Sequence, residues 1–538
     1  MSESGTLTPP DIDGDRRARE VARRRTFAII SHPDAGKTTL TEKLLLYSGA
    51  IELAGAVRGG KARRHATSDW MEMEQQRGIS ISAAALEFEM DGHRVTLLDT
   101  PGHQDFSEDT YRTLLAVDSV VMVLDATKGI EAQTLKLFQV CRDRRIPVLT
   151  FINKLDLPAR DPFGLLDEIE RVLGINAAPM NWPLGDGQNF SGVYDLQEEA
   201  LLLYERSARG TRTEPIAVTD PSDPMVEEIV GPTRQRELIE ALEIIAGAGT
   251  PFDEDAYRAE TQTPVFFGSA LQDFGVEPFL KALLRLAPSP RPRQGDTRLV
   301  QPTDADFSGF VFKIQANMNP RHRDRVAFFR ITSGKLTKDM AVQNGRTGQT
   351  MWLSRVYRFF GRDRETVPEG YAGDVVGLVN PGHLTIGDTL YAGAPVRFPP
   401  IPSFPPERFG RLRPRAGRHK KFDQAVRELA EEGLLQTFFP PEGTGNPIIG
   451  VVGALQFDVV EARMTSEYGI ESAVDVMPYV AVRWLVPTGQ AKPKLKLPWS
   501  GVMAAVDRLG RNVLLFETTF ALNYVAEHNP AYQLRDTW

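Results

Sequence analysis

Short apolar runs alternate with longer stretches of helical periodicity through the first half of the chain. Strand-like runs of four or five residues occur at 27–30, 94–98 and 120–124, and helical patterns occur at 131–143 and 163–173. Apolar runs of this length are typical of strands that are buried on both faces of a parallel sheet. The pattern predicts an α/β domain with a mostly parallel sheet and helices on both faces.

The second half of the chain has a different pattern. From about 305 to 400, short β-rich runs are separated by Gly, Asn and Asp turns, which predicts a small β-barrel. After a proline-rich stretch at 399–406, helical periodicity covers 423–437, a strand-like run covers 448–453, and a second helical pattern lies near 457–468. These elements predict an α+β domain.

These changes of pattern divide the chain into three predicted domains. The first spans residues 1–292 and ends at a proline-rich linker, the β-barrel spans 300–400, and the α+β domain spans 401–538. Within the first domain, two strand-like runs are separated by roughly 110 residues, which is too long for a connecting loop. We therefore expect an inserted subdomain at about 175–260.

Composition limits the function classes. Among 538 residues there is one cysteine, Cys141, so no internal disulfide is expected and a reducing, cytoplasmic location fits. The start of the chain is polar and charged, and no apolar run is long enough to span a membrane, so no membrane partner is expected. The net charge of -8 argues against a protein that coats nucleic acid through its overall field.

A candidate phosphate-binding loop follows the first strand-like run. Residues 31–39 read SHPDAGKTT, and such a loop directs its backbone N–H groups toward phosphates, while Lys37 reaches the β and γ phosphates and Thr38 ligates Mg²⁺. Ser31 stands where the general motif has its first glycine, so a simple turn between strand and helix remains the alternative. The predicted nucleotide contacts in this loop are Ser31, His32, Pro33, Asp34, Ala35, Gly36, Lys37 and Thr38.

A second candidate segment follows the run at 94–98. Asp99 lies at the end of this strand and can hold Mg²⁺ through a water, and the N–H of Gly102 can bond the γ-phosphate. The predicted nucleotide contacts in this segment are Asp99, Thr100, Pro101, Gly102 and His103.

The identity of the base is predicted from an NKLD tetrapeptide that follows another apolar strand. The Asp156 carboxylate can accept from guanine N1–H and its 2-amino group, whereas adenine would leave it unpaired at a cost of about 1–3 kcal/mol. We expect Asn153 to face guanine O6 and N7, the Lys154 stem to cover the base plane, and backbone N–H groups at 269–270 to reach O6. The predicted base contacts are Asn153, Lys154, Leu155, Asp156, Ser269 and Ala270. In this order, the segments favour a GTP/GDP site with Mg²⁺.

The chain resembles translational GTPases and, among them, the bacterial peptide chain release factor 3 family. In the first domain the resemblance is carried by SHPDAGKTT (31–39), DWMEMEQQRGISI (69–81), DTPGHQDFSEDTYRTL (99–114), FINKLD (151–156) and FFGSAL (266–271). Beyond it, FVFKIQANMNPRHRDRVAFFRITSGK (310–335) and VGALQFDVVEARMTSEYGIE (452–471) match as well. The resemblance extends from about Ala22 into the early 530s, nearly the whole chain.

The resemblance implies a GTP hydrolase that the ribosome stimulates. It implies that His103 is the catalytic residue that positions the attacking water, with a surface histidine as the alternative. Ser80 would ligate Mg²⁺ only when GTP is bound, so the implied metal ligands are Thr38, Ser80 and Asp99. Most relatives have threonine at this position, and serine lacks the methyl group that restricts χ1. A monovalent cation near Asp34 is also implied.

The resemblance further implies that the GTP-bound form displaces class I, codon-reading release factors from the ribosome after peptide release. The chain has no Gly-Gly-Gln tripeptide, so we do not expect it to hydrolyse peptidyl-tRNA itself. The expected partners are the ribosome, through its rRNA and proteins, and class I release factors, with the chain acting as a monomer. A translocase would need further domains, and another ribosome-associated GTPase switch, in stress or assembly, remains the alternative function.

Basic clusters are weaker candidates for contacts to rRNA or ribosomal proteins. They lie at 321–325 and 411–421, and charge runs of this kind are more often solvated surfaces. The arginine-rich stretch at 16–25 is predicted to be a solvated helix, and 487–500 departs from the family pattern.

Overall fold

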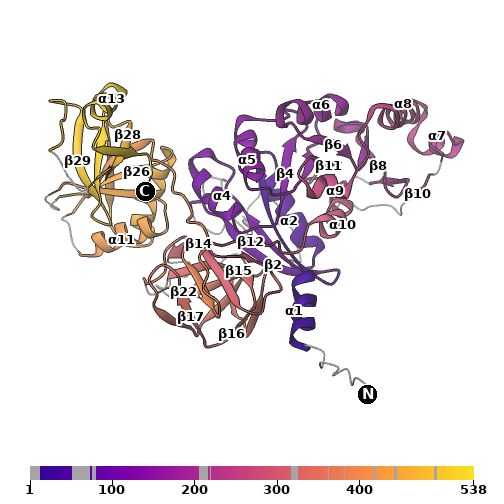
Figure 1. The fold of residues 1–538 in the computed structure, drawn as a ribbon. Helices are drawn as coiled ribbons and strands as arrows, with labels where there is room; N and C mark the ends of the chain where they lie inside the picture. Colours follow the sequence, from indigo (N-terminus) through magenta and orange to yellow (C-terminus); the bar gives the residue numbers. More distant parts are fainter. Residues whose placement is uncertain are drawn as a thin grey trace, which may run out of the picture.

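The structure is a computed structural model with three lobes (Figure 1). It describes residues 12–50, 73–74, 80–204, 216–218, 220–316, 325–360, 363–380, 382–416, 420–441, 445–489 and 494–537. Among the helices formed by these residues, none is both long enough and apolar enough to cross a membrane.

The first domain is built on a mostly parallel sheet with strand order β2-β3-β1-β4-β5-β11-β6. Its strands are β1 (Arg24–Ser31), β2 (Ala84–Met90), β3 (His93–Asp99), β4 (Ser119–Asp125), β5 (Val148–Asn153), β6 (Asn176–Pro179) and β11 (Gln262–Phe267). Only the pairing of β2 with β3 is antiparallel among these strands. The phosphate loop, the 99–103 segment and the NKLD segment therefore all follow the carboxyl ends of parallel strands, where ligands of open α/β sheets bind.

Helices cover both faces of this sheet. Apolar residues of α2 (Lys37–Tyr47) and α10 (Val276–Leu286) pack in one core cluster, and those of α5 (Ala132–Asp143) and α6 (Pro162–Leu173) pack in another. The shorter helix α4 (Ser107–Leu114) follows the 3-10 helix η1 (Gln104–Phe106). The predicted α/β fold class is confirmed.

Between β6 and β11 the chain forms a small additional sheet, at the upper right of Figure 1. Its antiparallel strands are β7 (Asn181–Leu184), β8 (Gly192–Asp195), β9 (Ala200–Leu203) and β10 (Ile216–Ala217), with the 3-10 helix η2 (Gly187–Asn189) between the first two. Helices α7 (Pro224–Val230), α8 (Pro232–Ala248) and α9 (Glu254–Arg258) follow them.

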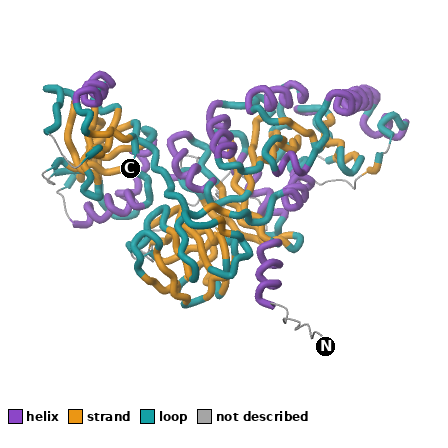
Figure 2. The backbone as a smooth tube through the Cα atoms, in the orientation of Figure 1, coloured by secondary structure: helices purple, strands orange, loops and turns teal. Residues whose placement is uncertain are grey.

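The second lobe is a curled antiparallel β domain, as predicted (Figure 2). Its strands are β14 (Phe307–Ala316), β15 (Arg325–Ser333), β16 (Lys335–Thr337), β17 (Met340–Asn344), β18 (Thr350–Leu353), β19 (Val356–Phe360), β20 (Asp363–Thr366), β21 (Glu369–Tyr371), β22 (Val375–Val379) and β23 (Thr389–Ala392). The linker before it carries β12 (Arg293–Gln294) and β13 (Leu299–Val300). The two domains are joined edge to edge, because Phe360 of β19 pairs with Leu86 of β2.

A buried ion pair also links the first domain to the second. Arg24, 1% exposed, donates from Nε and Nη2 to the two carboxylate oxygens of Asp374, at 2.7 and 2.9 Å. The prediction of a solvated helix through 16–25 was therefore wrong at its end. Helix α1 (Ile12–Ala22) stops before Arg24, which begins β1, and its charge is buried because Asp374 of the second domain compensates it.

The third lobe is an α+β domain, as predicted, and is drawn at the left of Figure 1. Its sheet has the strands β24 (Arg408–Pro414), β25 (Gln436–Phe439), β26 (Ile448–Val451), β27 (Ser472–Met477), β28 (Ala481–Pro487), β29 (Val502–Asp507), β30 (Asn512–Phe516) and β31 (Tyr532–Arg535). Its helices are α11 (Lys420–Glu431), α12 (Leu455–Ser466) and α13 (Thr519–His528). The helix predicted at 423–437 ends at Glu431, because Gly433 adopts a left-handed φ of 78° and strand β25 follows.

Candidate nucleotide site

The phosphate loop has the backbone that its sequence suggested. It leaves the buried strand β1 at Ser31 and enters α2 at Lys37, with left-handed φ angles at Asp34 (65°) and Gly36 (93°). A Cβ atom at Gly36 would lie 2.2 Å from Nδ2 of Asn153, so only glycine fits there. No side chain caps the start of α2, and its first N–H groups remain available for an anion.

The 99–103 segment lies against this loop. Nζ of Lys37 contacts Oδ1 of Asp99, and these side chains are 6% and 2% exposed. The hydroxyl of Thr100 donates to the Ile29 carbonyl at 2.6 Å, and a Cβ at Gly102 would lie 3.7 Å from the backbone of Pro33. The structure thus places Lys37, the predicted phosphate-binding lysine, in contact with Asp99, the predicted metal-binding carboxylate.

Asn153 connects the phosphate loop to the 269–270 loop. It is 2% exposed, its Nδ2 donates to the Ala35 carbonyl at 2.8 Å, and its Oδ1 accepts from the Ala270 N–H at 2.8 Å. This bridge across three segments was not foreseen from the sequence, which assigned Asn153 and the Ala270 N–H to guanine.

The other base-binding candidates are also held by neighbours. Asp156 Oδ1 accepts from the Ser269 hydroxyl at 2.6 Å, which orients the carboxylate. Lys154 has a left-handed φ of 72°, and its Nζ lies 2.9 Å from Oδ2 of Asp125. Leu155 is buried and donates its N–H to the Gly268 carbonyl at 3.2 Å.

Asp125 is a site residue that the sequence prediction missed. Burial alone would raise the pKa of its carboxyl, but hydrogen bonds from Thr127 and Lys154 outweigh burial, so the pKa lies below its ordinary value. The carboxylate therefore stays charged and holds the Nζ of Lys154. The available signal was an aspartate at the end of an apolar strand, as at Asp99.

His32 is a buried residue of the phosphate loop. Its side chain is buried, Nδ1 contacts Glu131, and Nε2 has no hydrogen-bond partner among the described residues. Burial lowers the pKa of the imidazole, although the Glu131 carboxylate opposes this effect. A neutral histidine here adds no positive charge to the loop.

His103 precedes η1 and lies at the edge of the site. Its Nδ1 accepts from the Asp105 N–H at 3.2 Å, and the side chain is 33% exposed, so the ring has room to meet a small molecule. Ser80 is followed by a fixed turn, because the buried Glu74 carboxylate accepts from the N–H groups of Ile81 and Ser82, at 2.9 and 3.1 Å. Within the stretch 69–81 that carries the family resemblance, residues 69–72 and 75–79 lie outside the described residues.

The predicted metal ligands form an oxygen set with few charges. Within the described ranges, no group of three or more His, Cys, Asp or Glu side chains could hold a metal by itself. A set of Thr38, Ser80 and Asp99 fits Mg²⁺, which binds through one or two carboxylates together with phosphates and waters.

The basic clusters are only partly described. Residues 321–324 and 417–419 lie outside the described part of the chain. Arg325 contacts Glu431 of the third domain, and Arg413 pairs with Asp475 at 2.5 and 3.1 Å. These two charges are engaged within the protein.

Comparison with known proteins follows the three lobes. The Elongation factor Tu GTP binding domain model matches residues 22–289, the Elongation factor G domain 2 model matches 306–393, and the model of the C-terminal domain of class II release factor RF3 matches 398–526. Similar curated proteins include peptide chain release factor 3 of Symbiobacterium thermophilum, 52% identical over 97% of this chain and 99% of its own. The factor of the same name from Gloeobacter violaceus is 51% identical, over 96% and 98%.

A solved structure has a similar fold over most of the chain. A crystal structure from Thermus thermophilus superposes with a TM-score of 0.68 at 26% identity, and the match covers 87% of this chain and 71% of that one.

Proposed function

The chain belongs to the peptide chain release factor 3 family of translation termination GTPases, and from that premise we propose that the ribosome stimulates its hydrolysis of GTP. The observation that supports binding and hydrolysis of GTP most directly is the convergence of the phosphate loop, Asp99 and the NKLD segment at one edge of the parallel sheet. We further propose that the chain acts as a monomer in the cytoplasm.

Phosphate binding rests on the loop at 31–38 and on the 99–103 segment. The N–H groups at the start of α2 meet the phosphates, and Lys37 exchanges its contact with Asp99 for the β and γ phosphates. Bound Mg²⁺ would neutralise charge on the phosphate oxygens, with Thr38, Ser80 and Asp99 as its protein ligands. A monovalent cation beside Asp34 would add to this neutralisation.

Guanine recognition rests on Asp156. The Ser269 hydroxyl occupies one lone pair of Oδ1, and the carboxylate keeps acceptors for guanine N1–H and the 2-amino group. The Lys154 stem, held by Asp125, covers the base plane. Asn153 contributes by keeping the base loops in register with the phosphate loop, and any contact it makes with O6 or N7 is additional.

Hydrolysis requires a group that orients water beside the γ-phosphate. His103 is the candidate, because it follows Gly102, which adjoins the phosphate loop, and its ring is partly exposed. Without a partner that orders this segment, turnover is expected near the unstimulated range of about 10⁻⁴ to 10⁻² per second.

GTP binding can change the conformation of the protein only if GTP binds one domain arrangement more tightly than another. Contacts of Ser80 and Gly102 to the γ-phosphate would supply this difference, since GDP lacks that group. We propose that the favoured arrangement displaces class I release factors from the ribosome after peptide release.

The test measures GTP turnover by the purified protein with and without ribosomes, followed by dissociation of a labelled class I release factor from a post-termination complex. Stimulated turnover with faster dissociation is the expected result. Stimulation without faster dissociation would favour another ribosome-associated GTPase role, and no stimulation would contradict the proposal.

A further inference from the structure

The His103 segment contacts the third domain through a hydrogen bond made by Asp105. Its carboxylate Oδ2 accepts from the N–H of Leu455 at 2.8 Å, and Leu455 is the first residue of α12. Asp105 itself is 8% exposed. A carboxylate of the first domain therefore lies at the N-terminus of a helix that belongs to the third domain.

The Asp105 carboxylate takes the place of an N-cap side chain, which α12 lacks. The N-cap position is Ala454, which makes no side-chain capping bond. The N–H groups of Gln456 and Phe457 bond to the carbonyls of Gly453 and Ala454, at 3.2 and 3.1 Å, and the Leu455 N–H takes its acceptor from outside the helix. Gln456 turns its Oε1 back to the N–H groups of Val452 and Gly453, and Asp105 accepts from Leu455. An anion at a helix N-terminus is also favoured by the helix dipole.

Gly453 provides the space for this approach. A Cβ atom at Gly453 would lie 1.9 Å from Cγ of Asp105 and 2.3 Å from each of its carboxylate oxygens. The backbone at Gly453 is outside the left-handed region, so an L-residue could adopt it without strain. The nearest obstacle to a side chain at 453 is therefore Asp105, from the other domain.

On its other side, Asp105 engages the imidazole. Its backbone N–H donates to Nδ1 of His103 at 3.2 Å, so a neutral ring carries its proton on Nε2. The next residue, Phe106, packs with Ile81 and Val459 in a small apolar cluster. Because Ile81 directly follows Ser80, this cluster joins both the Ser80 and the His103 segments to α12.

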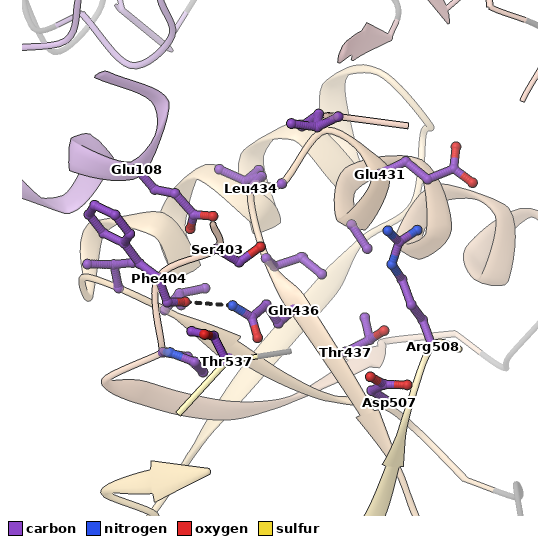
Figure 3. A pocket seen from close by; sticks show the side chains of 18 of the residues that line it. Glu108, Ser403, Phe404, Glu431, Leu434, Gln436, Thr437, Asp507, Arg508 and Thr537 are labelled. Carbon is purple, nitrogen blue, oxygen red and sulfur yellow. Dashed lines mark hydrogen bonds between the residues drawn. The ribbon is translucent and has the colours of Figure 1, made fainter. Parts of the chain in front are cut away.

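Contact between these domains is not continuous around this point. A cavity of about 420 Å³ lies beside it, lined by α4, the second domain, the linker to the third domain and the third domain itself. In Figure 3, Glu108 of the first domain lines this cavity together with Leu434 and Gln436, and the Gln436 amide donates to the Phe404 carbonyl at 2.7 Å. The Asp105–Leu455 bond is thus one of a limited set of contacts that hold α12 against the His103 segment.

We propose that Asp105 is a positioning residue that makes the orientation of His103 depend on docking of the third domain through α12. When α12 is docked, the carboxylate is fixed between Gly453 and Leu455, and the backbone of residues 103–106 is held with its N–H on Nδ1. When α12 moves away, this restraint is lost and the ring can turn. The inference rests on the proposed role of His103 in GTP hydrolysis.

The test compares substitutions on the two sides of the contact in the full chain. Gly453→Ala, which introduces the clash, and Asp105→Ala, which removes the acceptor, should each lower ribosome-stimulated kcat at least tenfold. GTP affinity and KM should stay within about twofold, because the phosphate and base loops are untouched. Asp105→Asn should keep kcat within about threefold, since its amide oxygen can still accept from Leu455. Gly489→Ala is the matched control, because a Cβ there meets nothing within 4 Å.

The double variant Asp105→Ala/Gly453→Ala distinguishes loss of the Asp105–Leu455 hydrogen bond from the clash that a methyl group at position 453 makes with Asp105. Removing the carboxylate makes room for the added methyl group at position 453, so the domains should dock again while kcat stays low. Docking is measured by the distance between spin labels at Lys136→Cys in α5 and Ser466→Cys in α12, both exposed positions, since the native Cys141 is buried. A broadened distance distribution is expected for Gly453→Ala, and a normal one for the double variant.

Three results would overturn the coupling. Full kcat in the double variant would show that the carboxylate is not needed, full kcat in an undocked Gly453→Ala protein would show that docking does not matter, and a Gly453→Ala protein with wild-type distances and kcat would show that the contact is not made. His103→Ala, measured in parallel, tests the premise separately. If it keeps stimulated turnover, the proposed role of His103 fails, whatever the docking data show.

Discussion

The loops that hold the nucleotide and the segment that carries His103 lie side by side but are restrained differently. The base and phosphate loops are tied to one another within the first domain, through Asn153, through Ser269 on Asp156, and through Lys154 on Asp125. The His103 segment instead has its main side-chain anchor in the third domain, where Asp105 accepts from Leu455.

This difference indicates that binding and hydrolysis are separable properties of the chain. The first domain can select and hold a guanine nucleotide with its own contacts. If the proposed role of Asp105 holds, the geometry needed for hydrolysis also depends on where the third domain lies, and a partner such as the ribosome could control the reaction through it. Each prediction below asks whether one property changes while the other stays constant.

The largest difference between the effect on hydrolysis and the effect on GTP binding is expected for His103→Ala. Ribosome-stimulated turnover should fall by about 10²- to 10⁴-fold, which is the usual contribution of a positioned catalytic side chain. GTP affinity should not change, because His103 makes none of the contacts between the base and phosphate loops. Single-turnover hydrolysis with ribosomes and fluorescent-nucleotide titration measure the two quantities. A parallel loss of GTP affinity would contradict the separation.

For Asp156→Asn we expect the opposite result, namely weaker GTP binding with an intact hydrolytic step. Replacing a charged acceptor of two hydrogen bonds with an amide should weaken GTP binding by about 10- to several hundredfold, since each charge-assisted bond contributes about 1.5–3 kcal/mol. Xanthine has a carbonyl where guanine has the 2-amino group, so xanthosine triphosphate should bind better than GTP to this variant. With that nucleotide at saturation, stimulated turnover should return to near the wild-type rate. Failure of this rescue would mean that Asp156 also affects the hydrolytic geometry.

A smaller effect, on the pH dependence of stability, is expected at Glu87 on β2. Glu87 on β2 contacts Arg94 and lies 3.2 Å from Arg358 of the second domain. Burial, reinforced by the Asp374 charge and opposed by Arg94 and Arg24, raises the pKa of its carboxyl to about 7 from 4.5. The folded protein therefore keeps a proton that the unfolded chain releases, so the free energy of unfolding should fall as pH rises from about 4.5 to 7.

This pH dependence amounts to at most about 3 kcal/mol. Glu87→Gln should flatten it, as measured by denaturant unfolding at pH 5 and pH 8, without changing base preference or stimulated turnover at pH 7. An unchanged slope in the variant would assign the pH dependence to other groups.

Much of the nucleotide site could be predicted because its signals are local. The glycine, lysine and aspartate positions follow apolar strands directly, and parallel strands bring their carboxyl ends together. The partners of those residues were harder to foresee. The sequence does not show that Asn153 accepts from Ala270 or that Asp105 meets Leu455, since these pairs are 117 and 350 residues apart.

Two errors of prediction have the same origin. Arg24 belongs to an arginine-rich stretch, which suggested a solvated helix, but a carboxylate from the second domain allows its burial. The helix predicted at 423–437 was extended by the leucines that follow Gly433, although that glycine ends it and Leu435 leads into a strand. In both cases a tertiary contact or a backbone angle outweighed the local periodicity.

The pairing of Arg24 with Asp374 also has a consequence for how the protein is made. The two residues are 350 positions apart, so a growing chain exposes Arg24 long before its acceptor exists. At typical synthesis rates of about 5–20 residues per second, this delay is roughly 20–70 seconds. During that time Arg24, at the first position of the strand that leads into the phosphate loop, lacks its buried partner Asp374 and has only Glu20 of α1 beside it. The nascent first domain should therefore reach its full stability only after the second domain has emerged, although the contacts between its own nucleotide loops can already form.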